Sequence, residues 1–421
     1  MMPSTIIIVC VVLLAAKWLT QMVLERINQK HVLAHANAVP PAFASTVTPE
    51  TYAKSVAYTL AKSRLEMLNL TWSAVLLAVV LFSGVLPWFF LIFERATGSS
   101  VWAGAAFLFT VGLILSVVDW PLEWYAQFYL EERFGFNAST AATWWLDRAK
   151  GLILGAVLGY PLLILILKLA SNLGGLWWLW AWACLAVFQI VLMLVAPVWI
   201  MPLFNQFTPL PAGNLRDALL RLGERAGFRA QDIQVMDGSK RSRHSNAFFT
   251  GLGRFRKIVL FDTLIQQLEP AELASVLAHE IGHYKKGHIV KTIAFSLAGS
   301  LPIFFLVAVL AKADWFARGF GFAPGNLVPV LLLISLLAGL VSFWLSPLRH
   351  YWSRRHEYEA DAYAANLVKT FAPLIGALRK LNEKNLSNLT PHPAYSGFYY
   401  SHPTLLEREA ALTQSASPNL I

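Results

Sequence analysis

The sequence predicts a mainly α-helical membrane protein with seven membrane-spanning helices and a zincin-like segment on the cytoplasmic side. Of the 421 residues, 57% are hydrophobic and only 14% are charged, which lies outside the usual range of soluble domains. Apolar segments of membrane-spanning length occur seven times along the chain. The stretch His-Glu-Ile-Gly-His at residues 279–283 has the spacing of a zinc-binding helix.

Seven segments are long and apolar enough to cross a bilayer, which requires about 20 mainly apolar residues each. We expect the first to be retained as an anchor rather than cleaved as a signal peptide. No basic residue precedes it, whereas Lys17, Arg26 and Lys30 follow, opposite to the order in signal peptides. The predicted spans are residues 4–24, 67–93, 101–121, 152–170, 176–201, 292–311 and 327–347.

Basic residues favour one orientation of these spans, with the N-terminus outside and the C-terminus in the cytoplasm. The expected partner is the lipid bilayer, and attraction of basic residues to its anionic surface explains the net charge of +10. No nucleic-acid partner is expected, because no nucleic-acid-binding module is recognisable. No retrieval signal ends the chain, which favours a bacterial inner membrane. In a eukaryote, the expected location is the endoplasmic reticulum membrane. The inner loops carry Arg26, Lys30, Lys54, Lys62, Arg64, Arg133, Arg148 and Lys150.

The polar segments between the spans divide the chain into four parts. Residues 1–201 hold the first five spans with cytoplasmic loops 26–64 and 122–151, and Pro49 in the first loop predicts a helix start. Spans six and seven, within 292–347, act as a helical hairpin. We expect this hairpin to bring a peptidase segment, 202–291, and a C-terminal segment, 348–421, together at the membrane boundary.

A helix from Ala271 to Lys286, with Pro270 in its first turn, carries the first candidate site residues. His279 and His283 are four residues apart and share one helix face, so both imidazoles can bind one zinc ion. Glu280 then suits a general base that takes a proton from the water activated by zinc. The sequence therefore predicts one zinc ion per chain and hydrolysis of a peptide bond.

The third zinc ligand is not the next histidine. One group of zinc peptidases places a His six residues after the second ligand, where this chain has Ile289. His288 would be rotated about 140° from His283 on a continuing helix. We therefore expect His288 to be a partly solvated or interface residue.

A second polar helix around residues 353–363 offers the missing ligand. Glu357 and Asp361 share a face, whereas Glu359 is rotated about 200° from Glu357 and should point elsewhere. Glu357 is therefore predicted to bind zinc, and Asp361 to accept the free N–H of a ligand imidazole. The alternative for this segment alone is a solvated run of charges with helical salt bridges.

Residues 244–250 and 256–261 are β-prone runs separated by Gly251-Leu252-Gly253, which predicts a hairpin before the zinc helix. The edge of such a hairpin can bind an extended peptide as an added strand.

Taken together, these motifs resemble the Ste24-type integral-membrane zinc peptidases of family M48, also called type I CAAX prenyl endopeptidases. The resemblance implies seven membrane helices that enclose a large chamber, with the zinc site facing it. It covers nearly the whole chain and rests on 134–137 with Asp147 and Lys150, on 201–210, 243–247, 279–283, Glu357 with Asp361, 400–403 and Glu407-Arg408.

The resemblance also implies roles for three further residues. Asn246 would bond the substrate backbone, although a turn-capping Asn is the alternative. His402 and Arg408 would contact the substrate or its developing oxyanion. Without the resemblance, His402 reads as a loop residue and Arg408 as a surface charge.

For the substrate, the resemblance implies a peptide or lipidated protein, cleaved to remove the C-terminal tripeptide beyond a prenylated Cys. A broader membrane quality-control zinc protease of the HtpX type is the nearest alternative, because fold resemblance does not fix the substrate. A zinc-binding membrane protein or transporter without peptidase activity is the alternative from another class. The presence of Glu280 argues against it.

Overall fold

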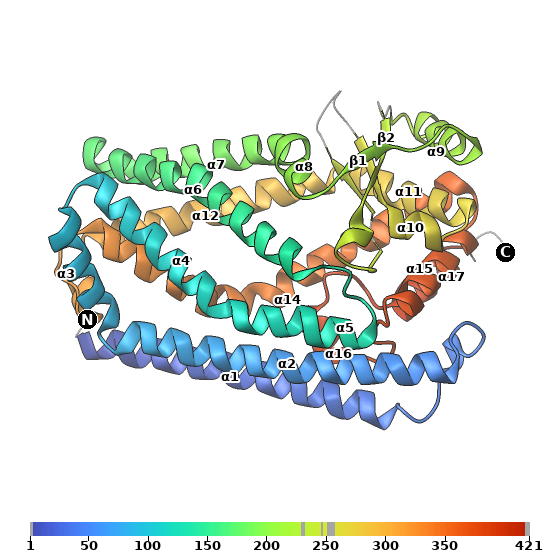
Figure 1. The fold of residues 1–421 in the computed structure, drawn as a ribbon, viewed down its shortest axis with the longest axis horizontal. Coiled ribbons are helices and arrows are strands. Elements are labelled where there is room, and N and C mark those ends of the chain that lie inside the picture. Colours follow the sequence, from blue (N-terminus) through green and yellow to red (C-terminus); the bar gives the residue numbers. More distant parts are fainter. Residues whose placement is uncertain (1–2, 229–231, 246, 251–256, 417–421) are drawn as a thin grey trace.

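The computed structural model describes residues 3–228, 232–245, 247–250 and 257–416. Within these residues, seven helices are long and apolar enough to cross a membrane, as the sequence predicts. They run along the long axis of the molecule, and a small sheet lies at one end among shorter helices (Figure 1). The C-terminal helices lie at the same end, so the peptidase elements gather on one side of the bundle.

The first two spans, α1 (Pro3–Ala34) and α2 (Pro49–Phe82), lie side by side along one flank (Figure 1). A 3-10 turn (Pro41–Phe43) lies between them. As predicted, α2 begins at Pro49, and the Thr48 side chain caps it by accepting from Thr51 N at 3.2 Å. The predicted second span, 67–93, is wrong at its C-terminal end. Gly84 adopts φ 79° and starts a separate helix, α3 (Val85–Thr97), since glycine takes this conformation without strain.

The next three spans are α4 (Val101–Tyr125), α6 (Ala141–Asn172) and α7 (Trp177–Val195). A π-helical turn (Ala126–Glu131) and the short helix α5 (Glu132–Phe134) follow α4. In the same way, a π-helical turn (Ala196–Ile200) and the short helix α8 (Met201–Phe204) follow α7. α4 packs on α6, and α6 on α7. Buried Phe107 of α4 makes edge contacts with Phe90 and Phe93 of α3, which lies at the end of the bundle opposite the sheet (Figure 1).

The sheet consists of β1 (Phe207–Pro209), β2 (Asp232–Met236), β3 (Ala247–Thr250) and β4 (Lys257–Phe261) in the order β1-β2-β4-β3. β2 pairs with β4 in parallel, and β3 pairs with β4 antiparallel. The predicted hairpin before the zinc helix is confirmed, and β3 lies at the edge of the sheet. Helices α9 (Asn214–Arg225) and α10 (Asp262–Gln267) flank it.

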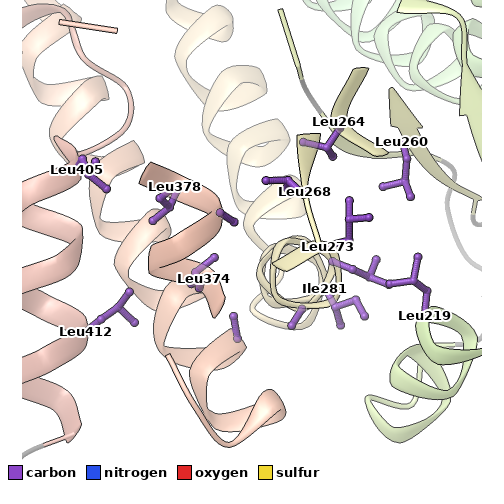
Figure 2. Packing of buried hydrophobic residues seen from close by; sticks show 14 of the residues in the cluster. Leu219, Leu260, Leu264, Leu268, Leu273, Ile281, Leu374, Leu378, Leu405 and Leu412 are labelled. Atoms are coloured by element: carbon purple, nitrogen blue, oxygen red, sulfur yellow. The ribbon is translucent and has the colours of Figure 1, made fainter. Parts of the chain in front are cut away.

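The peptidase core surrounds α11 (Pro270–Lys285), whose start is fixed by a capping box between Glu269 and Glu272. Leu273 and Ile281 of α11 are buried among leucines of the sheet, α9, α15 (Ala372–Lys384) and α17 (Leu405–Ala416) (Figure 2). Burial of each such side chain stabilises the fold by about 1.5–3 kcal/mol. This core fixes the rotation of α11 and therefore the direction of its histidines.

Two spans join the peptidase segment to the C-terminal segment. α12 (His288–Ala311) follows α11 after Gly287, and a short α13 (Asp314–Gly319) leads to α14 (Leu327–Val368). The last predicted span, 327–347, is part of this single helix of 42 residues, which leaves the apolar region and continues as the polar helix that carries Glu357. α16 (Pro393–Tyr399) packs on α14 before α17.

Candidate active site

The candidate site forms where α11 crosses α14, and Gly282 sets the distance between the two helices. A Cβ atom at Gly282 would lie only 3.0 Å from both the Cα and the carbonyl oxygen of Ala360. The helices pack this closely because residue 282 has no side chain. Gly282 lies between His279 and His283, so the contact brings both imidazoles opposite the acidic face of α14.

Three side chains converge at this crossing. His279, His283 and Glu357 each offer one ligand atom, and these atoms lie within 4.8 Å of one another. The two Nε2 atoms face each other at 3.1 Å. Glu357 Oε1 lies 3.3 Å from His283 Nε2, and Glu357 Oε2 lies 3.5 Å from His279 Nε2. Glu357 Oε2 is buried without a hydrogen-bond partner among the described residues. Two imidazole nitrogens and one carboxylate that converge in this way can hold a metal ion.

Asp361 and Arg408 support the first histidine from behind. Asp361 Oδ1 lies 2.8 Å from His279 Nδ1, and Arg408 Nε donates to Asp361 Oδ2 at 2.8 Å. Arg408 is buried, and its Nη1 lies 3.7 Å from Glu357 Oε2. Burial alone would lower the pKa of His279, but the Asp361 and Glu357 carboxylates outweigh it and raise the pKa to about 9. Arg408 thus lies behind the three candidate ligands, beside the carboxylates of Asp361 and Glu357, rather than in the substrate or oxyanion contact that the resemblance implies.

The second histidine has a support that the sequence prediction missed. His283 Nδ1 lies 3.0 Å from His288 Nδ1, and His288 Nε2 lies 3.1 Å from Glu359 Oε2. Of the two settings expected for His288, partly solvated or at an interface, the structure has the second: the residue is only 3% exposed and lies between His283 of α11 and Glu359 of α14. Glu359 points away from the ligand group, as predicted, and contacts His288 there.

A cleft of about 440 Å³ opens beside these residues, and Glu280 and His402 line it. Burial raises the pKa of Glu280 above the ordinary value of a glutamate, and the nearby His279 and His283 partly offset this shift. A base with a raised pKa is better matched to neutral pH. The His402 side chain is 65% exposed, and its Nε2 lies 3.5 Å from Glu357 Oε1. The structure therefore brings Glu280 and His402 to the same opening.

A second and larger cavity of about 990 Å³ adjoins the cleft. It lies between α1, α2 and the C-terminal segment, and His402 and Arg408 line it. His402 thus borders both spaces.

The segment that leads into β3 is held by residues of α6 and of the loop that precedes it. Arg241 makes a bidentate ion pair with Asp147 of α6 at 2.7 and 2.9 Å. The His244 ring stacks on Phe136 at 4.1 Å. Residue pairs so distant in sequence leave no local pattern, which is why sequence reasoning did not find these contacts. Asn246 lies outside the described residues.

The chain is similar to known proteins along nearly its full length. A family profile described as CAAX prenyl protease N-terminal, five membrane helices, matches residues 28–206, and one described as peptidase family M48 matches residues 209–416. CAAX prenyl protease 1 of Saccharomyces cerevisiae is 39% identical over 407 residues, which cover 89% of this chain and 88% of the yeast protein. The human CAAX prenyl protease 1 homolog is 31% identical, with coverage of 91% and 90%.

A solved structure is also similar. The crystal structure of S. mikatae Ste24p matches with a TM-score of 0.89 at 34% identity, over 96% of this chain and 98% of that one. The family inferred from the motifs and the membrane-helical fold class are thereby confirmed, and family membership implies a metal cofactor. The chain belongs to peptidase family M48 and is an integral multi-pass membrane metalloendopeptidase of the Ste24 type.

Proposed function

We propose that His279, His283 and Glu357 hold one zinc ion per chain. Nitrogen and oxygen ligands at about 2.0–2.2 Å from a tetrahedral zinc ion lie about 3.3–3.6 Å apart. The Nε2–Nε2 separation of 3.1 Å, and the separations of 3.3 and 3.5 Å from these nitrogens to the two oxygens of Glu357, lie near that range, and one ligand atom from each residue lies within 4.8 Å of the others. Glu357 Oε2 carries the proposal, because it is buried without a hydrogen bond among the described residues and the Arg408 guanidinium, at 3.7 Å, lies beyond hydrogen-bonding distance, which leaves this oxygen able to bind a metal ion.

The protein residues around zinc have separate tasks in the proposed hydrolysis. Zinc supplies Lewis-acid activation of a water molecule and of the substrate carbonyl. Glu280 accepts the proton of that water and then donates it to the leaving amine. His402, exposed in the cleft, donates a hydrogen bond to the oxyanion that develops on the carbonyl. Arg408 and Asp361 act from behind by fixing the orientation of His279.

For the substrate, we propose a prenylated protein that ends in a CAAX sequence, from which the C-terminal tripeptide is removed. The names of the yeast and human relatives support this substrate class. The edge strand β3 offers backbone groups for strand addition, and Asn246, just before it in sequence, would bond the substrate backbone. The cavity of about 990 Å³ beside His402 offers room on the other side of the site.

We also propose an orientation with the N-terminus outside and the zinc site at the cytoplasmic boundary, supported by the excess of basic residues in the predicted inner loops. A bacterial inner membrane or an endoplasmic reticulum membrane accommodates this arrangement equally. Cysteine-accessibility labelling at Ser4 and Thr413 tests it: the impermeant reagent should reach only position 4 from outside.

Cleavage of paired peptides tests the proposed function. The detergent-purified protein is given a farnesylated CAAX peptide and its unprenylated twin, with and without a zinc chelator. Chelator-sensitive release of the tripeptide from the farnesylated peptide alone is the expected result. Equal cleavage of both peptides would instead indicate the broader HtpX-type protease.

A Glu280→Gln variant is the matched control. Glutamine cannot accept the proton, so activity should fall by about 10²–10⁴-fold while zinc content stays at one ion per chain. Full activity in this variant would refute the proposed mechanism. Stoichiometric zinc without cleavage of either peptide by the unmodified protein would favour the non-catalytic alternative.

A further inference from the structure

We infer that His288 and Glu359 position His283 as a zinc ligand, through a hydrogen-bonded relay from carboxylate to imidazole to imidazole. The inference rests on the proposed function, because it takes His283 as a ligand. The new element is the identity of the residues that orient the His283 ring.

The contacts of the relay are short and the residue at its centre is buried. His283 presents Nε2 to His279 and Glu357, which leaves Nδ1 as its outer nitrogen. This Nδ1 lies 3.0 Å from His288 Nδ1, and the other nitrogen of His288 lies 3.1 Å from Glu359 Oε2. Only 4% of the His288 side chain is exposed, against 41% of the Glu359 side chain. The relay therefore starts at a half-exposed carboxylate and ends at the ligand.

Only one placement of protons satisfies every contact of the relay when Nε2 of His283 offers its lone pair to a metal. His283 must then carry its proton on Nδ1, which donates to Nδ1 of His288. His288 accepts there, so its own proton lies on Nε2 and donates to the Glu359 carboxylate. Both rings are neutral, and the carboxylate at the outer end selects the tautomer of both.

Packing fixes the plane of the central ring. The His288 imidazole stacks on that of His356, with centroids 4.0 Å apart and an interplanar angle of 7°. The Trp352 ring covers His356 in turn, at 4.6 Å. A ring held in this way can rotate little, so it holds the hydrogen bond to His283 in one direction.

A break between two helices makes the relay possible. On a continuous helix, His288 would face about 140° away from His283. Gly287 adopts φ 68° at the junction of α11 and α12, and this left-handed residue turns the chain so that His288 returns to the outer side of His283. The two ligand histidines thus receive carboxylate support in different ways: His279 directly from Asp361, and His283 through one intervening ring.

The zinc dissociation constant of the full-length protein in detergent tests the inference, measured by competition with a chromophoric chelator. In His288→Phe, the aromatic ring keeps the stack on His356 but lacks both nitrogens. Loss of an outer partner of a metal ligand weakens metal binding by about 10–100-fold, and we expect this range. The chelator-treated variant should lose some stability together with the hydrogen bonds to His283 and Glu359, whereas a merely structural role for His288 would leave the zinc affinity of the folded protein unchanged.

Variants at Glu359 keep the test decisive if His288→Phe fails to fold. Glu359→Ala should also weaken zinc binding, whereas Glu359→Gln should restore it, since an amide oxygen still accepts from His288. Glu224→Ala, at an exposed glutamate of α9, is the matched control and should bind zinc normally. Unchanged zinc affinity in both His288→Phe and Glu359→Ala would overturn the inference. An unmodified protein that binds no zinc would instead overturn the proposed function.

Discussion

Substitution of Gly282 by alanine tests whether the close approach of α11 and α14 sets the geometry of the metal site. The new Cβ would lie 3.0 Å from the Cα and the oxygen of Ala360, and 3.2 Å from Tyr363 Cβ. Two of these three atoms are backbone and cannot rotate away. The helices must therefore separate by about 0.4 Å to reach an ordinary contact of 3.4 Å.

This displacement acts on the proposed ligands directly, because Gly282 and Ala360 lie within the two ligand-bearing turns. Metal–ligand distances tolerate deviations of only about 0.2 Å, so we expect zinc affinity to fall at least about tenfold, the lower end of the loss for disturbed outer contacts. Overpacking costs about 1–3 kcal/mol, and the higher helix propensity of alanine offsets about 1 kcal/mol. The free energy of unfolding should thus fall by only about 0–2 kcal/mol, so the variant remains folded and its zinc affinity can be measured.

Chelator competition gives the zinc affinity, and thermal unfolding in detergent gives the stability. Gly299→Ala on α12 is the matched control, because a Cβ there meets nothing within 4 Å; this variant should bind zinc as the unmodified protein does. Normal zinc affinity and normal peptide cleavage in Gly282→Ala would refute the reasoning that this contact sets the site.

Three further predictions concern charges around the site. In the zinc-loaded protein, where His279 is a neutral ligand, Arg408→Met should destabilise the fold by about 3–5 kcal/mol, because Asp361 would remain as a buried carboxylate without its cation; thermal unfolding measures this. Asp147→Asn removes the charge that pairs with Arg241, an interaction worth about 1 kcal/mol at this partial exposure. The Asp147→Asn variant should have a several-fold lower kcat/KM than the unmodified protein, at constant zinc content. After chelator treatment, the unfolding temperature should fall as pH rises from about 6.5 to 9, because the pKa of His279 is about 9 in the fold but about 6.5 in the unfolded chain. Stabilisation by protonated His279 is complete below pH 6.5 and is lost above pH 9.

Each of these predictions has an outcome that contradicts it. An Arg408→Met protein with normal stability would mean that Asp361 does not depend on this cation. Loss of zinc in Asp147→Asn would place the effect of the ion pair at the metal rather than at the segment before β3. Zinc-loaded protein is the control for the pH series, and the same decline with zinc bound would exclude His279 as its origin.

Much of the fold could be predicted from the sequence, because apolar length and turn residues are local signals. The number of spans follows from hydropathy, and the start of α2 follows from Thr48 and Pro49. The end of the second span was mispredicted because apolar residues continue on both sides of Ser83 and Gly84. Hydropathy measures the composition of such a run, whereas the break depends on the conformation of one residue.

For the candidate site, too, features with a local sequence signal could be predicted, whereas features that depend on the tertiary fold could not. Residues on one face of one helix, such as His279 with His283, follow from helical periodicity. His288 was misplaced because the same periodicity was extended past Gly287, where the helix ends. The pair of Arg241 with Asp147 could not be inferred, since the two residues meet only through the tertiary fold and neither segment alone indicates the other.

The 42 residues of α14 have a further consequence. At 1.5 Å per residue the helix is about 63 Å long, roughly twice the hydrocarbon thickness of about 30 Å, so one uninterrupted element both crosses the bilayer and carries Glu357. α12, the span that follows the two histidines, begins only three residues after α11 ends. A thinner or thicker bilayer changes the tilt of such helices, and a change in tilt exerts a force on the residues of the metal site that these helices hold. Lipid composition is therefore expected to tune this peptidase, and a fragment freed from its membrane helices would lose the frame that holds the metal.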